Sequence, residues 1–447
     1  MRRTCRAHRA LTIGLRSLML ACAATVTEPA VGASEPAASA SDGIYVPAAT
    51  TQTEADEYTR YELLDPASAR FRIIYEVTAT TAGAQVFYNP IRKGSVASDE
   101  SVIDAASGKP LQFDVVSGAE AKRDPLTPDA DVATSYIRVR LARPVPEHGQ
   151  ARVVIRKTYT DRKSYYPEGQ ALVFDRPLGV PRNTIVLPAG YSLAALTVPS
   201  QILTEPDGRI AVSFLHAGAG EAPLKLRALA NAQSGAAALP HPASERRSWE
   251  SPYTGPTESE RLTQRAHEGR DIVYFLQPPQ THAFMLYHDY TESRPGVSGY
   301  ANVVRSGSTA SQPSAVDLDT GSDLAVRAMR GAQLAASGIN VGEAVEPSAH
   351  VVVIAFAPIT PGHSRRLRIT ETYTAPVSYG LDGDELVFDR SLGRPRNAIV
   401  LPKGWYCTFS AEPATLSTLP DGRVRLDYWN DRPEGLDVLL KARRTRR

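Results

Sequence analysis

The chain has 447 residues and carries 50 Lys and Arg against 48 Asp and Glu, a formal net charge of +2. This balance argues against a general nucleic-acid-binding protein, because such proteins gather basic residues on one face. Hydrophobic residues make up 42% of the chain, as in ordinary globular proteins, and the length suits two domains, each large enough to bury a core.

The first 33 residues are typical of an export signal. Four arginines near the N-terminus precede a short apolar run at 18–26, and small residues at 31–33 offer a cleavage site. The apolar run is too short to cross a bilayer as a stable helix. The segment Met19-Leu20-Ala21-Cys22 also resembles a bacterial lipobox, in which Cys22 would carry a lipid. The sequence therefore predicts a periplasmic or secreted protein, or alternatively an outer-membrane lipoprotein.

A flexible leader is expected at 34–57 and a first β-rich module at 58–232. Apolar and polar residues alternate within this module, which is typical of strands with one buried face. The dipeptide Asp207-Gly208 between apolar runs predicts a hairpin turn. The strands expected in the first module lie at 71–77, 137–141, 153–159, 171–174 and 184–187.

Residues 233–270 form a predicted linker, because they are rich in Pro, Ala and Ser. Thr257 and Glu260 resemble a capping box, which suggests one short helix over 259–267. A second β-rich module is expected at 271–443, with strands at 283–290, 350–356, 366–374, 385–388, 398–401, 423–428 and 437–440. No long segment has a helical period, so the predicted class is all-β.

The chain contains one stretch twice. Residues 172–190 read LVFDRPLGVPRNTIVLPAG and residues 386–404 read LVFDRSLGRPRNAIVLPKG, 214 positions later. Upstream the offset is 213, so that Tyr61 matches Tyr274. A period this long indicates a duplicated domain rather than a solenoid of short repeats. We therefore expect two tandem, duplicated β-sandwich-like modules joined by a linker.

Two resemblances support this reading. The order Tyr61, FRIIYEV at 71–77, IRVRL at 137–141 and VVIRKTY at 153–159 is similar to the β-rich N-terminal domain of single-zinc aminopeptidases. Those enzymes carry HExxH on a following helix, and this sequence has no HExxH, so the resemblance implies a fold type and not an activity. The FDRxLGxPRN segment also resembles uncharacterised exported tandem β-domain proteins of Gram-negative bacteria.

The duplicated stretch supplies the candidate site residues. An Asp next to one Arg and near a second suits an ion pair that pins a loop across two strands, and the spare Arg would be free for an anion. The candidate ligand-binding arginines are Arg176, Arg182, Arg390 and Arg396. Structural roles are expected for Asp175, Asn183, Asp389 and Asn397, and for Gly179 and Gly393 at backbone conformations closed to side chains.

Aromatic side chains near strand ends are the second set of candidates. Tyr166, Trp405 and Tyr406 would suit stacking on a sugar or contact with a partner protein. The alternative is that one member of each aromatic pair belongs to the core, because adjacent strand residues face opposite ways.

No metal or cofactor is expected. His288 and Asp289 are adjacent on a predicted strand and should point to opposite faces, which argues against a joint metal site with Glu292. Acidic residues alternate at Asp317, Asp319 and Asp323 as in calcium loops, but no bidentate Glu follows, so a plain turn is favoured. Cys407 aligns with Leu193 and is expected to be an apolar filler.

The sequence carries no G-x-S-x-G, P-loop or G-x-G-x-x-G motif. We therefore expect a non-catalytic exported envelope protein with a binding or structural role. The alternative is a hydrolase-related enzyme, or an accessory subunit, built on an aminopeptidase-like β-domain. Expected partners are an envelope protein or a glycan, with no nucleic acid, and contact with a membrane only through lipidation at Cys22.

Overall fold

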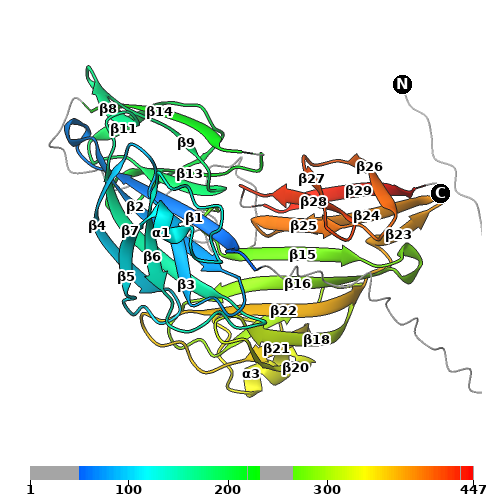
Figure 1. Ribbon diagram of the computed structural model, residues 1–447. Coiled ribbons are helices and arrows are strands. Elements are labelled where there is room, and N and C mark those ends of the chain that lie inside the picture. Colours follow the sequence, from blue (N-terminus) through cyan, green and yellow to red (C-terminus); the bar gives the residue numbers. More distant parts are fainter. Residues whose placement is uncertain (1–49, 219, 232–264, 433, 446–447) are drawn as a thin grey trace, which may run out of the picture. The chain divides into compact units, whose positions relative to one another are not determined.

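The computed structural model describes residues 50–218, 220–231, 265–432 and 434–445 (Figure 1). The predicted export signal, Cys22 and residues 259–264 of the predicted linker helix lie outside these residues, and residues 265–267 form a turn. All described residues belong to one compact unit, Ala38–Arg447. Within the described part of the chain, no helix is long and apolar enough to span a membrane.

The described residues fold almost entirely into strands, which are arranged in six sheets. This confirms the predicted all-β class with sandwich-like modules. The few helical segments are short and connect strands. They are η2 (Pro66–Ser68), α1 (Gly118–Ala121), η3 (Pro279–Thr281) and α3 (Gly331–Ala336).

Three sheets contain the strands up to residue 230, and we call them the first set. The largest has the order β12 (Gln201–Thr204), β13 (Ile210–Leu215), β10 (Arg182–Val186), β1 (Glu54–Leu63), β2 (Arg70–Ala79), β7 (Ala151–Thr160), β4 (Val96–Asp104). The second has the order β11 (Tyr191–Leu196), β14 (Ala222–Ala230), β9 (Ala171–Leu178), β8 (Tyr165–Glu168). The third is β3 (Val86–Pro90), β6 (Ser135–Arg140), β5 (Phe113–Ser117).

Three further sheets, the second set, repeat this strand order. The largest runs β27 (Thr415–Thr418), β28 (Val424–Trp429), β25 (Arg396–Val400), β15 (Arg270–Leu276), β16 (Ala283–Glu292), β22 (Arg365–Thr374), β18 (Thr309–Asp317), β19 (Ser322–Asp323). The others are β26 (Trp405–Ser410), β29 (Leu436–Arg444), β24 (Glu385–Leu392), β23 (Tyr379–Asp382), and β17 (Gly299–Val303), β21 (His350–Ala355), β20 (Ala325–Arg330). Positions related by the sequence offset of 213 or 214 are called equivalent below.

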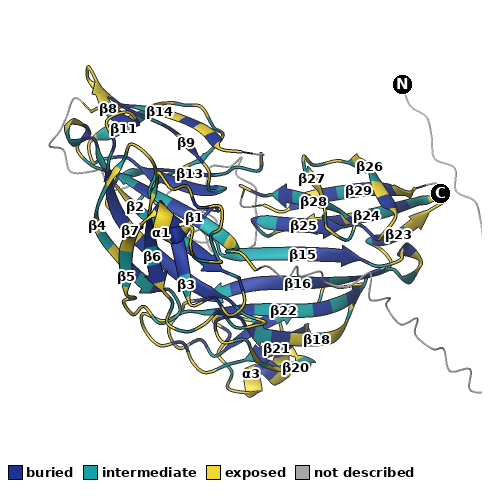
Figure 2. Cartoon of the chain, in the orientation of Figure 1, coloured by how far each residue is buried: buried dark blue, intermediate teal, exposed yellow. Residues whose placement is uncertain are grey.

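Alternating burial explains why these segments form strands. In β2 the side chains of Phe71, Ile73 and Tyr75 are buried, whereas Arg72 between them is exposed. Buried positions run along the central strands in Figure 2, and exposed positions gather at loops and at α1 and α3. Each set has its own main core, in which aromatic rings meet edge to face, as Phe71 and Phe174 do.

The predicted turn at Asp207-Gly208 joins β12 to β13, and Gly208 has a φ of 81°. Its equivalent, Gly422, has a φ of 85° between β27 and β28. Only Gly enters this left-handed region at little cost, which is why the Asp-Gly pair marked both hairpins correctly.

The N-terminal boundary differs from the prediction. Strand β1 begins at Glu54, so the last four residues of the segment predicted as a flexible leader belong to a sheet. Three of the four are acidic, which is why composition did not reveal the strand. The strand pairs in parallel with β10 and antiparallel with β2.

Candidate functional site

A β-bulge near the start of β1 creates a charged, largely buried point of contact between the two sets. The register of β1 against β2 shifts between Ala55 and Tyr58, and Asp56 within the bulge has a φ of 55°. Asp tolerates this left-handed conformation better than most residues. Bulges commonly re-aim a side chain, and here the carboxylate of Asp56 meets arginines from three strands.

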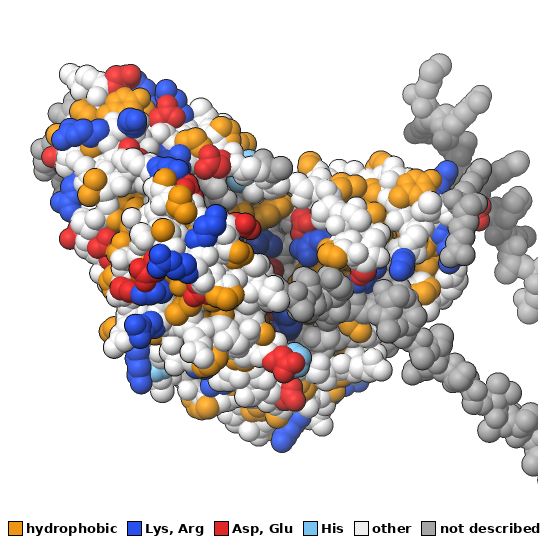
Figure 3. Space-filling view, viewed as in Figure 1, with side chains coloured by type: hydrophobic (Ala, Val, Ile, Leu, Met, Phe, Trp, Pro, Cys, Tyr) orange, Lys and Arg blue, Asp and Glu red, His pale blue; other side chains and the backbone are white. Residues whose placement is uncertain are grey.

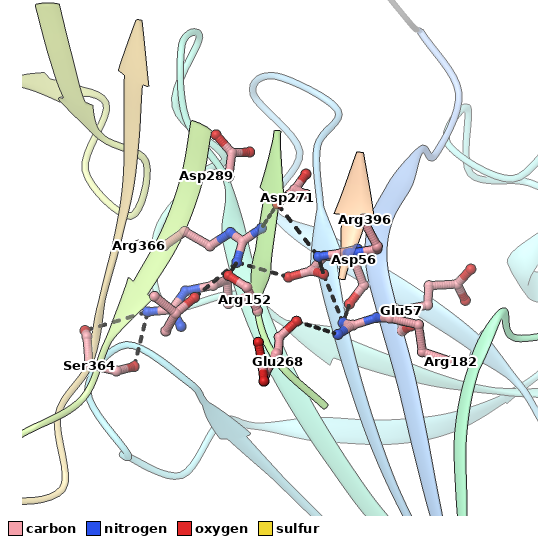
Figure 4. A network of polar contacts seen from close by, with 12 residues as sticks. Asp56, Glu57, Arg152, Arg182, Glu268, Asp271, Asp289, Ser364, Arg366 and Arg396 are labelled. Carbon is pink, nitrogen blue, oxygen red and sulfur yellow. Dashed lines mark hydrogen bonds and ion pairs between the residues drawn. The ribbon is translucent and has the colours of Figure 1, made fainter. Parts of the chain in front are cut away.

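Those arginines come from both sets (Figure 4). Asp56 Oδ1 lies 2.7 Å from Arg182 and 2.5 Å from Arg396, and Asp56 Oδ2 lies 3.1 Å from Arg366. Asp271 accepts a further contact from Arg366 at 3.1 Å. Burial alone would raise the pKa of the Asp56 carboxyl, but the three guanidinium groups together hold this pKa well below its ordinary value. Asp56 is therefore ionised throughout the physiological range.

The guanidinium of Arg182 is fully engaged. Besides Asp56, it donates to the carbonyl oxygens of Glu57 at 3.0 Å and of Ala266 at 2.9 Å. These contacts join β10 to β1 and to the segment that precedes β15. Arg182 and its equivalent Arg396 thus meet at one carboxylate and tie the two sets together.

A second link crosses between the sets in the opposite direction. Arg152 of β7 is equivalent to Arg366, and its Nε and Nη2 donate to both carboxylate oxygens of Asp319 at 2.7 Å each. The two side chains are only 9% and 6% exposed. Ser364 adds a hydrogen bond from its hydroxyl to the carbonyl of Ala105 at 2.8 Å. Planar, bidentate pairs of this kind fix orientation as well as distance.

Beside these links lies a cavity of about 540 Å³ lined by residues of both sets. Its other charged groups also have partners. His267 contacts Glu76 at 3.1 Å, and Arg294 contacts Glu292 at 2.7 Å. The guanidinium of Arg270 lies over the ring of Tyr290 at 4.7 Å. The charges around this cavity therefore act mainly on one another, as in a structural junction.

A smaller cavity recurs at an equivalent place in each set. In the first set it has a volume of about 290 Å³ and lies over β1, β2 and β7. Lys157 lies at its wall and donates to Asn89 Oδ1 at 2.6 Å. Burial lowers the pKa of Lys157 to about 7, and nearby Arg176 adds to the shift. The cavity also has acidic walls at Glu54 and Glu57.

The cavity of the second set has a volume of about 260 Å³ and lies over β15, β16 and β22. Glu371 occupies the position equivalent to Lys157 and accepts a hydrogen bond from Asn302 Nδ2 at 2.8 Å. Asn302 is in turn equivalent to Asn89. Burial raises the pKa of Glu371 to about 7. Equivalent positions in the two sets therefore hold a buried basic residue, Lys157, and a buried acidic residue, Glu371, and each of them is hydrogen-bonded to an asparagine.

The arginines around the two cavities differ in their counterions. Arg176 donates to Asp161 Oδ2 at 2.8 Å. Its equivalent Arg390 has Ala375 where Asp161 stands, and it makes no ion pair with any described residue. Both guanidinium groups lie over aromatic rings at matching distances, 5.4 Å from Phe71 and from Phe284. The two arginines thus have the same position relative to an aromatic ring, but only Arg176 has a carboxylate partner among the described residues.

The predicted pairing of Asp175 with its neighbouring arginines is wrong. Asp175 and Arg176 are adjacent in β9 and face opposite sides, so Asp175 contacts Lys225 on the neighbouring strand at 3.0 Å. Asp389 is exposed on β24, where it has the same orientation. Each Asp is adjacent to its Arg in the sequence, but adjacent residues of a strand point to opposite sides of the sheet, so the two side chains cannot pair.

The expectation for two glycines is also wrong. Neither Gly179 nor Gly393 has a φ in the left-handed region, and a Cβ added at Gly393 would meet no atom within 4 Å. These positions do not require glycine on conformational grounds. The asparagines that follow do hold the loop, since Asn183 and Asn397 donate to the carbonyls of Val180 and Arg394.

The three aromatic candidates lie in different environments. Trp405 is buried in the core of the second set, Tyr406 is 46% exposed, and Tyr166 is half-buried. The buried neighbour of Tyr166, Tyr165, donates its hydroxyl to the carbonyl of Leu64. One member of each pair is therefore core, and the structure does not bring Tyr166 and Tyr406 to a common site.

His288 and Asp289 point to opposite faces of β16, as predicted: His288 contacts Tyr300, and Asp289 binds Arg368 at 2.7 Å. The acidic turn is held by arginines, because Asp317 pairs with Arg365 and Asp319 with Arg152. Cys407 is partly buried against the second core. In the part of the chain that is described, no group of three His, Cys, Asp or Glu residues is placed to hold a metal ion.

Sequence reasoning missed several residues of these sites, namely Asp56, Arg152, Asp319, Lys157 and Glu371. A signal was available for the last two, because aligning the copies places a Lys opposite a Glu in otherwise matching strands. No such signal exists for Asp56, which has no acidic equivalent. On the face shown in Figure 3, basic and acidic side chains are interspersed rather than gathered by sign.

Comparison with known proteins gives a limited result. No family model matches the chain, and no curated protein matches it. Among solved structures it is similar to an M1 zinc metallopeptidase from Deinococcus radiodurans, with 12% identity, 39% of this chain and 41% of that chain covered, and a TM-score of 0.26. The matched part thus spans about two fifths of the peptidase.

Two further structures are similar at the same level. An aminopeptidase N family protein from Idiomarina loihiensis is 11% identical, with 39% of this chain and 29% of that chain covered and a TM-score of 0.23. A protein from Legionella pneumophila described as nutrient-binding is 10% identical, with 41% and 69% covered and a TM-score of 0.23. The resemblance to aminopeptidase β-domains stated from the sequence is thus matched, and at these scores it carries no argument about activity.

Proposed function

We propose that this chain is a non-catalytic exported protein of the bacterial envelope that binds ligands in the two recurring cavities. One observation carries the proposal: an equivalent asparagine beside a cavity in each set binds a buried ionisable side chain, Lys157 in the wall of the first cavity and Glu371 behind the wall of the second. Buried ionisable groups are costly to keep and gather at functional sites.

The cavity of about 540 Å³ is assigned a structural rather than a catalytic role, because of the junction between the sets beside which it lies. Its arginines contact Asp56, Asp271 and Asp319, so their charges are committed to holding the two sets together. A rigid junction would keep the two smaller cavities at a fixed separation. A partner that carries two suitable groups, such as an envelope protein or a glycan, would then bind both.

The binding proposal is tested by thermal unfolding of the full chain against envelope extracts, glycans and charged small molecules. A ligand that raises the midpoint should do so less in Lys157→Met or Glu371→Gln, according to the cavity that it occupies. A ligand whose effect is unchanged in both variants would place binding elsewhere. If no class of ligand raises the midpoint, the proposal is wrong.

Export is proposed from the arginine-rich N-terminus and the apolar run that follows. Expression with the native N-terminus in a Gram-negative host, followed by fractionation and mass spectrometry of the mature chain, tests it. Cleavage after residue 33 would indicate a periplasmic or secreted protein, and a lipid on Cys22 an outer-membrane lipoprotein. An unprocessed cytoplasmic chain would contradict export.

A second candidate function is a hydrolase-related enzyme or its accessory subunit. The observation in its favour is Glu371, whose pKa of about 7 would suit a general acid or base and which is bound by Asn302 of the cavity wall. Assay of the chain against peptide and ester substrates, with Glu371→Gln as the comparison, separates the two readings. Turnover that is lost in this variant would replace the binding proposal.

A further inference from the structure

The wall of the cavity in the second set carries an excess of positive charge, and Glu371, which accepts a hydrogen bond from the wall residue Asn302, lies outside that wall. The wall contains Arg305, Arg390 and Arg394 and no carboxylate. None of the three arginines forms an ion pair with any residue that the structure describes. In the first set, Arg92 and Arg176, equivalent to Arg305 and Arg390, have acidic partners in Glu221 and Asp161.

The sequence difference between the sets accounts for this imbalance. Asp161 is replaced by Ala375 and Glu221 by Gly435, which removes both internal counterions. Val180 is replaced by Arg394, which adds a charge. These three changes make the cavity wall more positive, whereas the replacement of Lys157 by Glu371 acts in the opposite direction.

Arg390 lacks an anionic partner among the described residues, and its polar contact is with the hydroxyl of Tyr274. Its side chain is 8% exposed, and its Nε and Nη1 have no hydrogen-bond acceptor among the described residues. The central carbon of the guanidinium lies 5.4 Å from the ring centroid of Phe284 and 5.7 Å from that of Tyr373, and these contacts hold the group at the cavity wall. A buried guanidinium without an anion is costly, whereas a fixed one is well prepared to bind an anion with two parallel hydrogen bonds.

The other walls select the shape of that anion. Ile272, Leu286 and Val303 supply aliphatic surface, and Tyr274 and Tyr373 supply aromatic surface. His288 also faces the cavity, and burial together with Arg394 and Arg270 holds the pKa of its imidazole well below the usual range, so it is neutral at pH 7. A volume of about 260 Å³ admits a small organic molecule.

We propose that this cavity binds a small carboxylate with an apolar body, which pairs with Arg390 and lies between Arg305 and Arg394. A planar carboxylate matches the two parallel N–H groups of a guanidinium. Phosphate would bring two charges and no apolar surface into a half-apolar cavity, at a larger desolvation cost. The inference rests on the proposed binding function and specifies the ligand class of one of its two cavities.

The chain itself suggests the variant that tests this. Ala375→Asp restores the counterion that the first set has in Asp161. Ser164, which donates to Asp161 at 2.7 Å, has an equivalent in Ser378, so the new carboxylate would find a donor besides Arg390. The matched control is Asp161→Ala, which frees Arg176 in the first set and leaves the second cavity as it is.

Isothermal titration of the full chain at pH 7 and low salt would use benzoate, hexanoate, succinate and inorganic phosphate as probes. We expect benzoate or hexanoate to bind to the wild type, with affinity at least about tenfold lower in Ala375→Asp. Asp161→Ala should retain this binding. Arg390→Lys, which keeps the charge and loses the fork, should also weaken it.

Three results would overturn the inference: no carboxylate binds, phosphate binds more tightly than the carboxylates, or Ala375→Asp binds as the wild type does while circular dichroism shows a native fold. The same experiments distinguish a failure of this inference from a failure of the proposed binding function. If other ligands raise the unfolding midpoint and respond to Lys157→Met or Glu371→Gln, the cavities bind ligands and only the carboxylate class is wrong.

Discussion

Lys157 and Glu371 occupy equivalent positions in β7 and β22, and each is bound by an asparagine from an equivalent strand of the smallest sheet of its set. The asparagine amide accepts from Lys157 and donates to Glu371, so one side chain serves both charge types. Burial moves both pKa values to about 7, from opposite sides. The two cavities thus share a framework and differ in their response to pH.

Glu371→Gln should raise stability at high pH. The pKa of Glu371 is raised in the fold, so the stability it contributes is present below its unfolded pKa and is lost as the pH rises toward 7. We expect the variant to exceed the wild type by about 2 to 3 kcal/mol at pH 8.5 and to match it near pH 4. Urea unfolding at both pH values measures this, and an equal effect at the two would contradict it.

Lys157→Met should show the opposite dependence. Its pKa is lowered in the fold, so stability is fully present above the unfolded pKa and is lost as the pH falls through about 7. The variant should be more stable than the wild type by about 2 to 4 kcal/mol at pH 6 and gain little near pH 10. Urea unfolding at pH 6 and pH 10 measures the difference in stability between the variant and the wild type. The Lys157 and Glu371 variants serve as controls for each other, because their pH dependences should be opposite.

Asp56→Asn should weaken the whole unit. The change removes the anion shared by Arg182, Arg366 and Arg396. Arg182 then has no ion-pair partner among the described residues, whereas Arg366 and Arg396 keep Asp271, and we expect a cost of about 3 to 5 kcal/mol. Denaturant unfolding gives the loss. Asp99→Asn is the matched control, since Asp99 also lies in a bulge with a φ of 56° but pairs with Arg70 at the surface. The idea is wrong if the two variants behave alike.

Asp319→Asn tests the second link between the sets. Arg152 would lose one oxygen of a buried bidentate pair, and we expect a loss of about 2 to 4 kcal/mol. Asp114→Asn is its surface counterpart, because Asp114 also binds one guanidinium, that of Arg138, with both oxygens. Thermal unfolding should show a clearly larger shift for Asp319→Asn, and equal shifts would argue that the link contributes little.

Gly108→Ala tests the close approach of the two sets at their backbones. Gly108 has a φ of 66°, and an added Cβ would lie 2.7 Å from the carbonyl oxygen of Gly362. Gly94→Ala introduces the same left-handed strain, at a φ of 84°, with no atom within 4 Å of the new Cβ. The first variant should cost about 1 to 3 kcal/mol more than the second in denaturant unfolding. Equal costs would mean that the two backbones separate easily.

The sequence by itself determined the β class, most strand positions, the hairpin turns and the correspondence between the two copies. Alternation of Phe71, Arg72 and Ile73, and the Asp-Gly pairs, act locally, and local patterns can be read without coordinates. The loop asparagines behaved as expected for the same reason.

Only the tertiary structure decided which charges meet. Asp175 lies next to Arg176 in the sequence but faces away from it, whereas Asp56, in a segment expected to be flexible, meets Arg366 more than three hundred positions later. A bulge in β1 sets that meeting, and bulges leave little trace in composition. An ion pair depends on which residues lie close together in the folded chain. Arg176 and Arg390 stand in nearly identical repeated stretches, so the sequence around them does not show which one has a counterion. The difference comes from the residue that the fold places beside each of them, Asp161 for Arg176 and Ala375 for Arg390.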